Sequence, residues 1–319
     1  MLFDLEILNK LIVCRHIGFL VLLLGITSST ALKTMKCIPW HSNTYCSIKN
    51  ETYHDENEAI EFNTDNYTIS DHDFTIFDTA NGNNNFSVFP NSIFEKFPYM
   101  TMIMFVEAQL KTLNKKSFSN CLGLLDLRLE KNLIQHLEAG VFEQCENILS
   151  LYLMSNKISS IDKDAFRNLW SLHTLDLFNN SITTLHQDTF NNIPNLLQLV
   201  LKNNQITQLH NDTFKQLKAM FYLDLSYNKI VTIESALFNV PGLTVLKLGH
   251  NRINAIQPNF FEYWPPNNTY TVDIALEYNF CIKKDFIKIR SPNLTLESVK
   301  PEFAQCFKNY MRPKLTPNV

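Results

Sequence analysis

The chain has 319 residues and a formal net charge of −3, from 28 lysines and arginines against 31 aspartates and glutamates. A balance this close to neutral gives no electrostatic case for a nucleic-acid partner or for an anionic membrane surface. The chain has seven glycines, and they do not form a glycine-rich phosphate-binding loop.

Residues 1–31 have the features of a secretory signal peptide. The basic residues Lys10 and Arg15 precede a ten-residue apolar core at 17–26, and Ala31 ends a run of small residues at the expected cleavage site. A membrane span needs about 20 residues, so cleavage is favoured over an uncleaved signal anchor. We therefore expect a secreted, extracellular protein with no stable membrane span after cleavage.

Residues 32–73 are predicted to form an N-terminal cap. Cys37 and Cys46 bracket a short loop near its start, and we interpret them as a pair that closes this end of the structure that follows. The rest of the segment is acidic and polar, which is typical of a solvated surface. Six cysteines remain after cleavage of the leader, and an even number suits disulfide pairing in a secreted chain.

Residues 74–262 are dominated by a repeat of about 24 residues. Six asparagines mark it at intervals of 24, 24, 24, 24 and 23 residues: Asn132, Asn156, Asn180, Asn204, Asn228 and Asn251. The same apolar positions recur around each of them, in the pattern LxxLxLxxNxIxxLxxxxF. A period of 20–29 residues is typical of a solenoid, whose units bury their apolar faces by stacking on their neighbours.

Each part of the pattern has a structural role. Strand side chains alternate, so the LxL step directs two leucines to one face of a short strand, and strands of neighbouring repeats then pair about 4.8 Å apart. The chain must turn sharply after the strand, which leaves backbone groups inside the solenoid in need of partners. An asparagine amide offers two donors and an acceptor, so we predict a ladder of asparagines along the stack.

The repeat weakens upstream of this block. Met100 and Phe118 keep the apolar register, but Ala108 stands where an asparagine is expected. We therefore expect six clear repeats with one or two degenerate repeats on their N-terminal side, because terminal repeats are atypical where they cap a stack. The ladder is expected to stop at Ala108.

Cys121 and Cys145 lie 24 residues apart, at equivalent points of successive repeats. Stacked equivalents are separated by about 5 Å, which is within the Cα range of a disulfide, and an oxidising compartment favours the bond. In the alternative, each cysteine replaces a buried leucine as a free thiol, since buried cysteine behaves as a small hydrophobe.

Residues 263–319 are predicted to hold a degenerate last repeat and a C-terminal cap. Asn279 fits the end of one more strand. Cys281 and Cys306 bracket the segment that follows, and we interpret them as a pair that closes the C-terminal end of the stack.

The repeat resembles the extracellular leucine-rich repeat family in its typical 24-residue form, most strongly over residues 98–262. Toll-like receptor ectodomains, insect leucine-rich immune proteins and small leucine-rich proteoglycans are similar. The resemblance implies an α/β solenoid, a horseshoe with a parallel β-sheet on its concave face. Its convex side would be mostly irregular or short helical, and its ends would be closed by disulfides.

Strand side chains that avoid the core lie six, four and two residues before each asparagine, and we expect them to form three columns on the concave face. Our candidate ligand-binding residues are a mid-sheet cluster of apolar side chains with two aspartates beside it: Tyr152, Met154, Phe178, Val200, Tyr222, Asp176 and Asp224. Exposed aromatic and methionine side chains on a sheet are typical of a protein-contact surface. Ordinary surface variation, or burial against a loop, is the alternative.

Seven Asn-X-Ser/Thr motifs predict N-glycosylation in a secreted chain: Asn50, Asn66, Asn85, Asn179, Asn211, Asn267 and Asn293. A glycan at Asn179 would lie at the rim of the candidate ligand surface.

Catalytic motifs are missing from the sequence. No Ser/His/Asp or Cys/His arrangement has a recognisable local context, and no cysteine or histidine cluster has metal-ligand spacing. We therefore expect no enzymatic activity, no metal and no cofactor.

The resemblance implies a secreted, non-catalytic recognition protein that binds an extracellular protein or glycan on its concave face, with innate immunity as the leading context. An extracellular matrix or cell-adhesion protein, and a soluble decoy of a receptor ectodomain, are the alternatives. The sequence leaves the oligomeric state open.

Overall fold

The computed structural model describes residues 33–36, 38–40, 42–49, 51–53, 60–63, 76–80, 82–263, 273–286 and 296–311. The signal segment 1–31, Cys37 and the glycosylation motifs at Asn50, Asn66, Asn267 and Asn293 lie outside the described residues.

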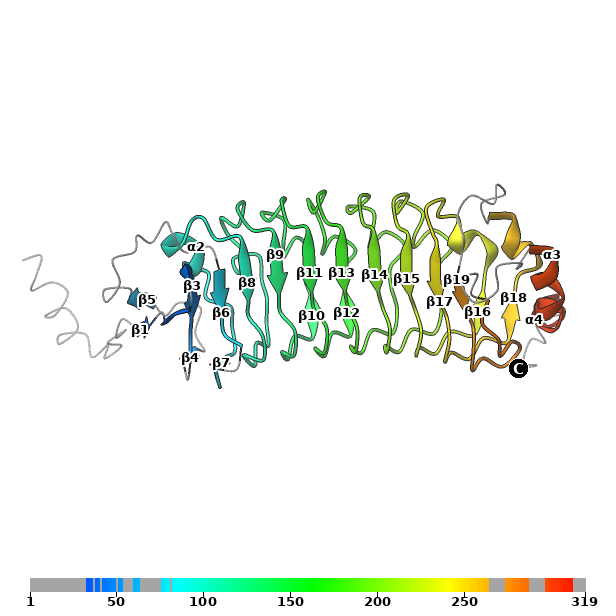
Figure 1. Ribbon diagram of the computed structural model, residues 1–319, viewed down its shortest axis with the longest axis horizontal. Coiled ribbons are helices and arrows are strands. Elements are labelled where there is room, and N and C mark those ends of the chain that lie inside the picture. The colour runs from blue at the N-terminus through cyan, green and yellow to red at the C-terminus, as the bar shows by residue number, and fades with distance from the viewer. Residues whose placement is uncertain are drawn as a thin grey trace, which may run out of the picture.

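Successive repeats each place one short strand in a continuous sheet that runs the length of the molecule (Figure 1). The sheet has eleven strands, and all neighbours are parallel except β2 and β3. Its members are β2 (Ile38–Trp40), β3 (Ser42–Ser47), β6 (Ile76–Asp78), β8 (Met102–Met104), β9 (Asp126–Arg128), β11 (Ser150–Tyr152), β13 (Thr174–Asp176), β14 (Gln198–Val200), β15 (Tyr222–Asp224), β17 (Val245–Lys247) and β19 (Asp273–Ala275).

The remaining elements are short. Two-residue strands pair in parallel in separate small sheets: β4 (Thr52–Tyr53) with β7 (Asn85–Phe86), β10 (His136–Leu137) with β12 (Ser160–Ile161), and β16 (Thr232–Ile233) with β18 (Ala255–Ile256). At the N-terminal end β1 (Lys33–Lys36) pairs with β5 (Ile60–Asn63). Helices in the described parts of the chain are α2 (Ser92–Lys96), α3 (Leu296–Val299) and α4 (Ala304–Met311), with 3₁₀ turns at η2 (Ser235–Phe238), η3 (Pro258–Tyr263) and η4 (Lys300–Phe303).

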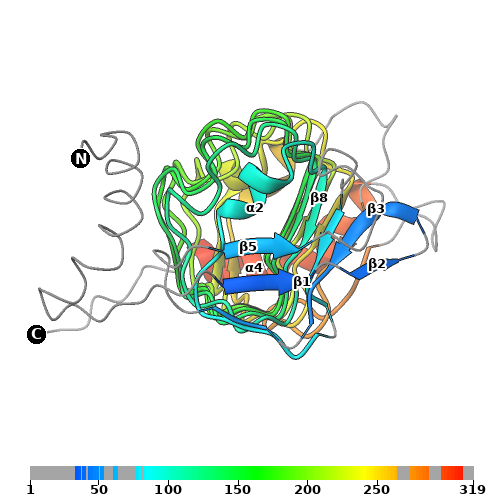
Figure 2. The same cartoon turned by 90° about the vertical axis from the view of Figure 1, so that its left-hand side faces the viewer.

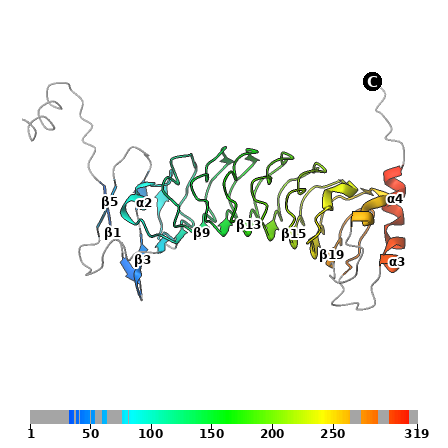
Figure 3. The ribbon, with the colours of Figure 1, turned by 90° about the horizontal axis from the view of Figure 1, so that it is seen from above.

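Viewed from its N-terminal end, the chain forms superimposed coils with the sheet along one side (Figure 2). Seen from above, the stack follows a shallow arc, and the strands lie on its inner side (Figure 3). The fold is therefore a leucine-rich repeat horseshoe with a parallel sheet on its concave face and little helix on its convex side.

The core is built from equivalent side chains stacked along the coil. Phe166, Phe190, Phe214 and Phe238 form a stack with ring centroids 6.2, 6.0 and 6.4 Å apart and nearly parallel planes. All four rings are buried. Burial of one such side chain contributes roughly 1.5–3 kcal/mol before its lost conformational entropy is counted, so each repeat adds to a single continuous core.

The six predicted asparagines are buried and join successive repeats. Asn180 is representative: its Nδ2 donates to the carbonyl oxygens of Leu153 and Leu177 at 3.0 and 3.1 Å, and its Oδ1 accepts from the N–H of Ile158 at 3.0 Å. Asn279 makes the equivalent contacts one repeat after Asn251. The amides satisfy the backbone groups that the turns leave inside the coil.

The expectation that the ladder stops at Ala108 is wrong. Asn84, which lies 24 residues before Ala108, is buried and donates to the carbonyls of Ile48 and Thr79. Its Oδ1 accepts from the N–H of Glu51. The gap at Ala108 is bridged because Asn132 Oδ1 accepts from the N–H groups of both Ala108 and Leu110.

Disulfides link Cys121 to Cys145 and Cys281 to Cys306, with Cα–Cα distances of 5.0 and 5.1 Å. Cys46 is buried and disulfide-bonded.

The C-terminal end of the core is covered by aromatic rings and by α4. Phe303 is buried against the rings of Phe260, Phe261 and Phe286. The Tyr310 hydroxyl on α4 donates to Glu234 at 2.6 Å, and this bond raises the pKa of Tyr310 to about 12. In the described part of the chain no helix has both the length and the apolar character needed to cross a membrane.

Candidate functional site

The strands of the sheet present side chains to the concave face in a regular way. The middle residue of each strand is buried in the core, while the residues on either side of it are mostly half-buried. The middle residues are Leu127, Leu151, Leu175, Leu199, Leu223 and Leu246, which lie in register with one another. The three predicted columns of outward side chains are therefore held in fixed positions by the sheet.

Six of the seven predicted contact residues are half-buried: Tyr152, Met154, Asp176, Phe178, Val200 and Tyr222. The register aligns Tyr152 with Asp176 and Asp176 with Val200 on adjacent strands, so these three form one continuous row. Tyr222 aligns with Gln198 instead and belongs to the column six residues before the asparagines. The sheet thus brings the cluster together over neighbouring strands, in a partly solvated position.

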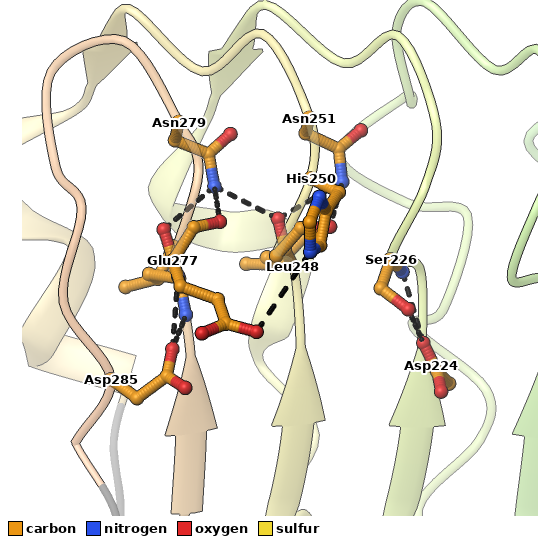
Figure 4. A network of polar contacts seen from close by, with 10 residues as sticks. Asp224, Ser226, Leu248, His250, Asn251, Glu277, Asn279 and Asp285 are labelled. Atoms are coloured by element: carbon orange, nitrogen blue, oxygen red, sulfur yellow. Dashed lines mark hydrogen bonds and ion pairs between the residues drawn. The ribbon is translucent and has the colours of Figure 1, made fainter.

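Asp224 requires a correction to the predicted site, because it is 4% exposed. Its Oδ1 accepts from the N–H of Ser226 at 3.0 Å and from the Ser226 hydroxyl (Figure 4). Its Oδ2 accepts from the Tyr222 hydroxyl at 3.4 Å and lies 3.9 Å from Lys247 Nζ. The carboxylate is satisfied inside the protein, so Asp224 supports the surface and has no free oxygen to offer a ligand.

Asp176 occupies the same place in its repeat but has fewer partners. Its Oδ1 accepts from the N–H of Phe178 at 2.8 Å. Among the described residues, no other group donates to this carboxylate and no basic nitrogen lies within salt-bridge distance. Burial raises the pKa of Asp176 above its usual range, the charge of Asp224 raises it further, and the Phe178 N–H opposes both.

Glu130 is a second half-buried carboxylate on this face, and the sequence reasoning did not single it out. Its Oε2 atom is buried and accepts no hydrogen bond from any described residue. Burial is the main reason that the pKa of Glu130 is raised. A hydrogen bond from the backbone N–H of Glu130 itself and the charge of Arg128 oppose this shift, and the charges of Asp126 and Asp176 add to it. Its position two residues before Asn132, in one of the three columns that face outward from the sheet, could have identified it.

The basic side chains around the cluster are already engaged. Arg128 Nε bonds Asp126 Oδ1 at 2.9 Å, and the guanidinium lies 5.0 Å from the centre of the Tyr152 ring. Lys247 Nζ donates to the Tyr222 hydroxyl at 2.9 Å, and this bond and the nearby Asp224 charge raise the pKa of Lys247. These contacts hold the two tyrosine rings in place.

The residues directly before Ala108 and before each ladder asparagine from Asn132 to Asn279 form a fourth column, on the rim, which the sequence reasoning missed. These residues all adopt positive φ, between 54 and 58°: Glu107, Lys131, Ser155, Asn179, Asn203, Tyr227, His250 and Tyr278. The left-handed turn directs their side chains along the rim, where several of them contact a neighbour. Only the fixed position within the repeat could have indicated this column, because the residue types at that position vary.

Several neighbouring members of the rim column contact one another. Lys131 and Glu107 form an ion pair at 3.7 Å. Asn179 donates to Ser155 Oγ at 3.1 Å and accepts from Asn203 Nδ2 at 2.7 Å.

At the C-terminal end of the rim, His250 stacks between two tyrosine rings. The ring centroids lie 4.1 Å from Tyr227 and 4.2 Å from Tyr278. His250 Nε2 also lies 3.9 Å from Glu277 Oε1 (Figure 4). Lys202 Nζ lies 5.2 Å from the Tyr227 ring and 5.8 Å from the Phe178 ring, which joins the rim stack to the candidate ligand surface.

Apolar side chains also line the edge where the strands begin. We call the residues seven before the asparagines the strand-start row. It includes Leu125, Leu149 and Phe221, which are 42, 38 and 37% exposed. Backbone bonds connect neighbouring members, for example from Leu149 N–H to the carbonyl of Leu125. This row is a second exposed apolar surface, and the sequence reasoning did not identify it.

The described glycosylation motifs differ in accessibility. Asn179 and Asn211 are exposed, whereas Asn85 is half-buried on β7. Their modification remains a prediction. Within the described ranges, no three histidine, cysteine, aspartate or glutamate side chains are grouped so as to hold a metal ion.

Comparisons with known proteins agree with this geometry. The family described as "Leucine rich repeat" matches residues 123–182 and 171–230. A search of curated proteins found no match.

Solved structures with the same fold include the LRIM1/APL1C complex (TM-score 0.58, 18% identity, 79% of this chain and 52% of that chain). They also include the APL1 leucine-rich repeat domain (TM-score 0.59, 20% identity, 77% of this chain and 65% of that chain). A third is the LRR protein LIC12759 of Leptospira interrogans (TM-score 0.53, 26% identity, 61% of this chain and 47% of that chain). The chain therefore spans less than two thirds of the length of each. The repeat, its asparagine ladder and these matches show a leucine-rich repeat solenoid, with a fold resembling those of the LRIM1/APL1C complex and the APL1 domain.

Proposed function

We propose that this protein is a secreted, non-catalytic recognition protein that binds an extracellular protein on its concave face. The observation that carries the proposal is the group of half-buried Tyr152, Phe178 and Tyr222 side chains, with Met154 and Val200 among them, on neighbouring repeats of one parallel sheet. Aromatic and methionine side chains dominate the energetics of protein interfaces. A preformed surface also loses little conformational freedom on binding.

Secretion is supported by the signal-like leader and by the disulfides, since such bonds persist in oxidising compartments. Innate immunity is the context we favour, because the repeat resembles those of insect immune proteins and Toll-like receptors. Leucine-rich repeats serve as binding scaffolds, which supports a role without catalysis.

The test is capture of partners from extracellular fluid by the immobilised mature protein, followed by mass spectrometry. The double variant Tyr152→Asp/Phe178→Asp should lose the captured protein while its thermal unfolding midpoint stays close to that of the wild type. The matched control is Leu125→Asp/Leu149→Asp, which places the same charges on the strand-start row. Loss of capture in the control variant alone would move the binding site to that edge and overturn the proposal.

A further inference from the structure

The edge where the strands begin carries a second row of exposed side chains beside the strand-start row. A tight turn precedes each strand and is closed by a backbone hydrogen bond, for example from the Leu172 N–H to the Leu169 carbonyl at 3.1 Å. The first residue at the tip of each turn lies ten before an asparagine, and we call these residues the turn row: Leu122, Glu146, Trp170, Pro194, Lys218 and Pro241. All are exposed except Pro194, which is half-buried. The two rows therefore run together along one edge of the solenoid.

Most side chains in the two rows are apolar, although they face solvent. Leu122 and Trp170 are 58 and 49% exposed, and they lie beside Leu125, Leu149 and Phe221 of the strand-start row. A contiguous exposed apolar surface marks an interaction site, and tryptophan is a typical centre of a protein interface. None of the glycosylation motifs in the described ranges falls in either row, so those motifs place no glycan on this edge.

The charges in the two rows form a self-complementary pattern. From Leu122 onward the rows hold one carboxylate, that of Glu146, and one ammonium, that of Lys218. Both side chains are exposed, and neither forms an ion pair within the described part of the chain. They lie three repeats apart in the turn row, about 14 Å at one strand spacing per repeat, and the two repeats between them carry Trp170 and Pro194.

A two-fold axis through the midpoint of this pattern brings unlike charges together. The axis lies in the contact plane, runs across both rows towards the sheet, and passes between the repeats of Trp170 and Pro194. Two copies related by it run antiparallel, and each row faces its own counterpart, as in an isologous interface. Glu146 of each copy then faces Lys218 of the other, and Trp170 of each copy faces Pro194 of the other.

The strand-start row fits the same symmetry, because Leu149 of one copy faces Phe221 of the other. A shift of one repeat in either direction would set both charges against apolar side chains, so the pattern favours a single register. We infer that this edge joins two copies of the chain in an antiparallel dimer, with Glu146 and Lys218 paired on both sides of the central apolar contact. Because the axis runs towards the sheet, both concave faces point to the same side of the dimer.

The test is sedimentation velocity of the glycosylated full chain over a range of concentrations, in which the wild type should approach the mass of two chains. Glu146→Lys and Lys218→Glu each oppose like charges at both pairs, so either variant alone should dimerise about tenfold more weakly or worse. An equimolar mixture of the two variants restores unlike charges at both pairs of the mixed dimer and should associate like the wild type. The matched control, Glu138→Lys, makes the same charge change at an exposed position outside both rows and should leave association unchanged.

A wild type that remains monomeric at every concentration would overturn the inference. So would a dimer that both single variants form as strongly as the wild type, or a mixture that associates no better than its components. These outcomes are independent of the proposed function. Leu125→Asp/Leu149→Asp should be monomeric yet capture its partner through an intact concave face, whereas Tyr152→Asp/Phe178→Asp should dimerise without capturing it.

Discussion

Asp176 and Asp224 occupy equivalent positions two repeats apart, but the carboxylate of Asp224 accepts hydrogen bonds from neighbouring side chains and that of Asp176 does not. Both accept a hydrogen bond from the backbone N–H two residues later. The repeat of Asp224 supplies Ser226 and Tyr222 as further donors, whereas the repeat of Asp176 has Phe178 and Thr174 in those places. The same backbone geometry therefore yields a structural carboxylate in one repeat and an open one in another.

Replacement of Asp224, whose carboxylate is satisfied inside the protein, should destabilise the protein. Asp224→Ala leaves the Ser226 N–H and the Ser226 hydroxyl without their acceptor in a buried setting, and it removes the negative charge that lies 3.9 Å from Lys247 Nζ. We expect a loss of about 1–3 kcal/mol in the free energy of unfolding, measured by urea denaturation. An unchanged denaturation midpoint would mean that water replaces the carboxylate without cost.

Replacement of Asp176, whose carboxylate accepts a single hydrogen bond, should instead preserve or increase the stability of the protein. Burial raises the pKa of Asp176 in the folded state, so between its unfolded and folded pKa values the folded chain binds more protons, and this group's contribution to stability falls as pH rises through that window. Asn keeps the acceptor for the Phe178 N–H and removes the charge. Asp176→Asn should therefore match the wild type at low pH and equal or exceed its stability at neutral pH, as measured by thermal unfolding across pH. A variant that is less stable than the wild type only at neutral pH would contradict this sign.

The asparagine ladder should be sensitive to single substitutions. Asn180→Ala removes the partners of the Leu153 and Leu177 carbonyls and of the Ile158 N–H, all inside the coil. We expect a loss of about 3 kcal/mol, since each buried unsatisfied group costs about 1–3 kcal/mol and some regain partial hydration. The control is Asn179→Gly, because Asn179 is exposed and has φ of 55°, which glycine adopts readily. Equal losses in the two variants would argue against the ladder as a source of stability.

The sequence predicts this fold well wherever a feature depends on the 24-residue period. The period alone identifies the stacking of Asn180 on its equivalents and the proximity of Cys121 to Cys145, because equivalent atoms in a solenoid lie one strand spacing apart. Asn84 was missed because it follows a segment without a clear apolar register, so its phase relative to Ala108 was not visible.

The candidate site was less predictable, because it depends on backbone conformation and on neighbours from other repeats. The contacts of Tyr227 with His250 require positive φ at both residues, and neither residue type signals that conformation. The burial of Asp224 depends on Ser226 and on Lys247 from the next repeat. Alternation along a strand predicts which face a side chain takes, but not which partners it finds there.

The disulfide between Cys121 and Cys145 should contribute stability by closing a loop of 24 residues. The loop-closure relation gives about 3.4 kcal/mol for this length, chiefly through a less disordered unfolded chain. Cys121→Ala/Cys145→Ala should therefore lower the urea midpoint by a corresponding amount, and part of that loss will come from the two buried sulfur atoms. Reduction of the wild type is not an equivalent test, because it also opens the bond between Cys281 and Cys306. Non-reducing peptide mapping should recover the peptides of Cys121 and Cys145 as one linked species, and recovery of both as free thiols would return them to the role of small buried hydrophobic residues.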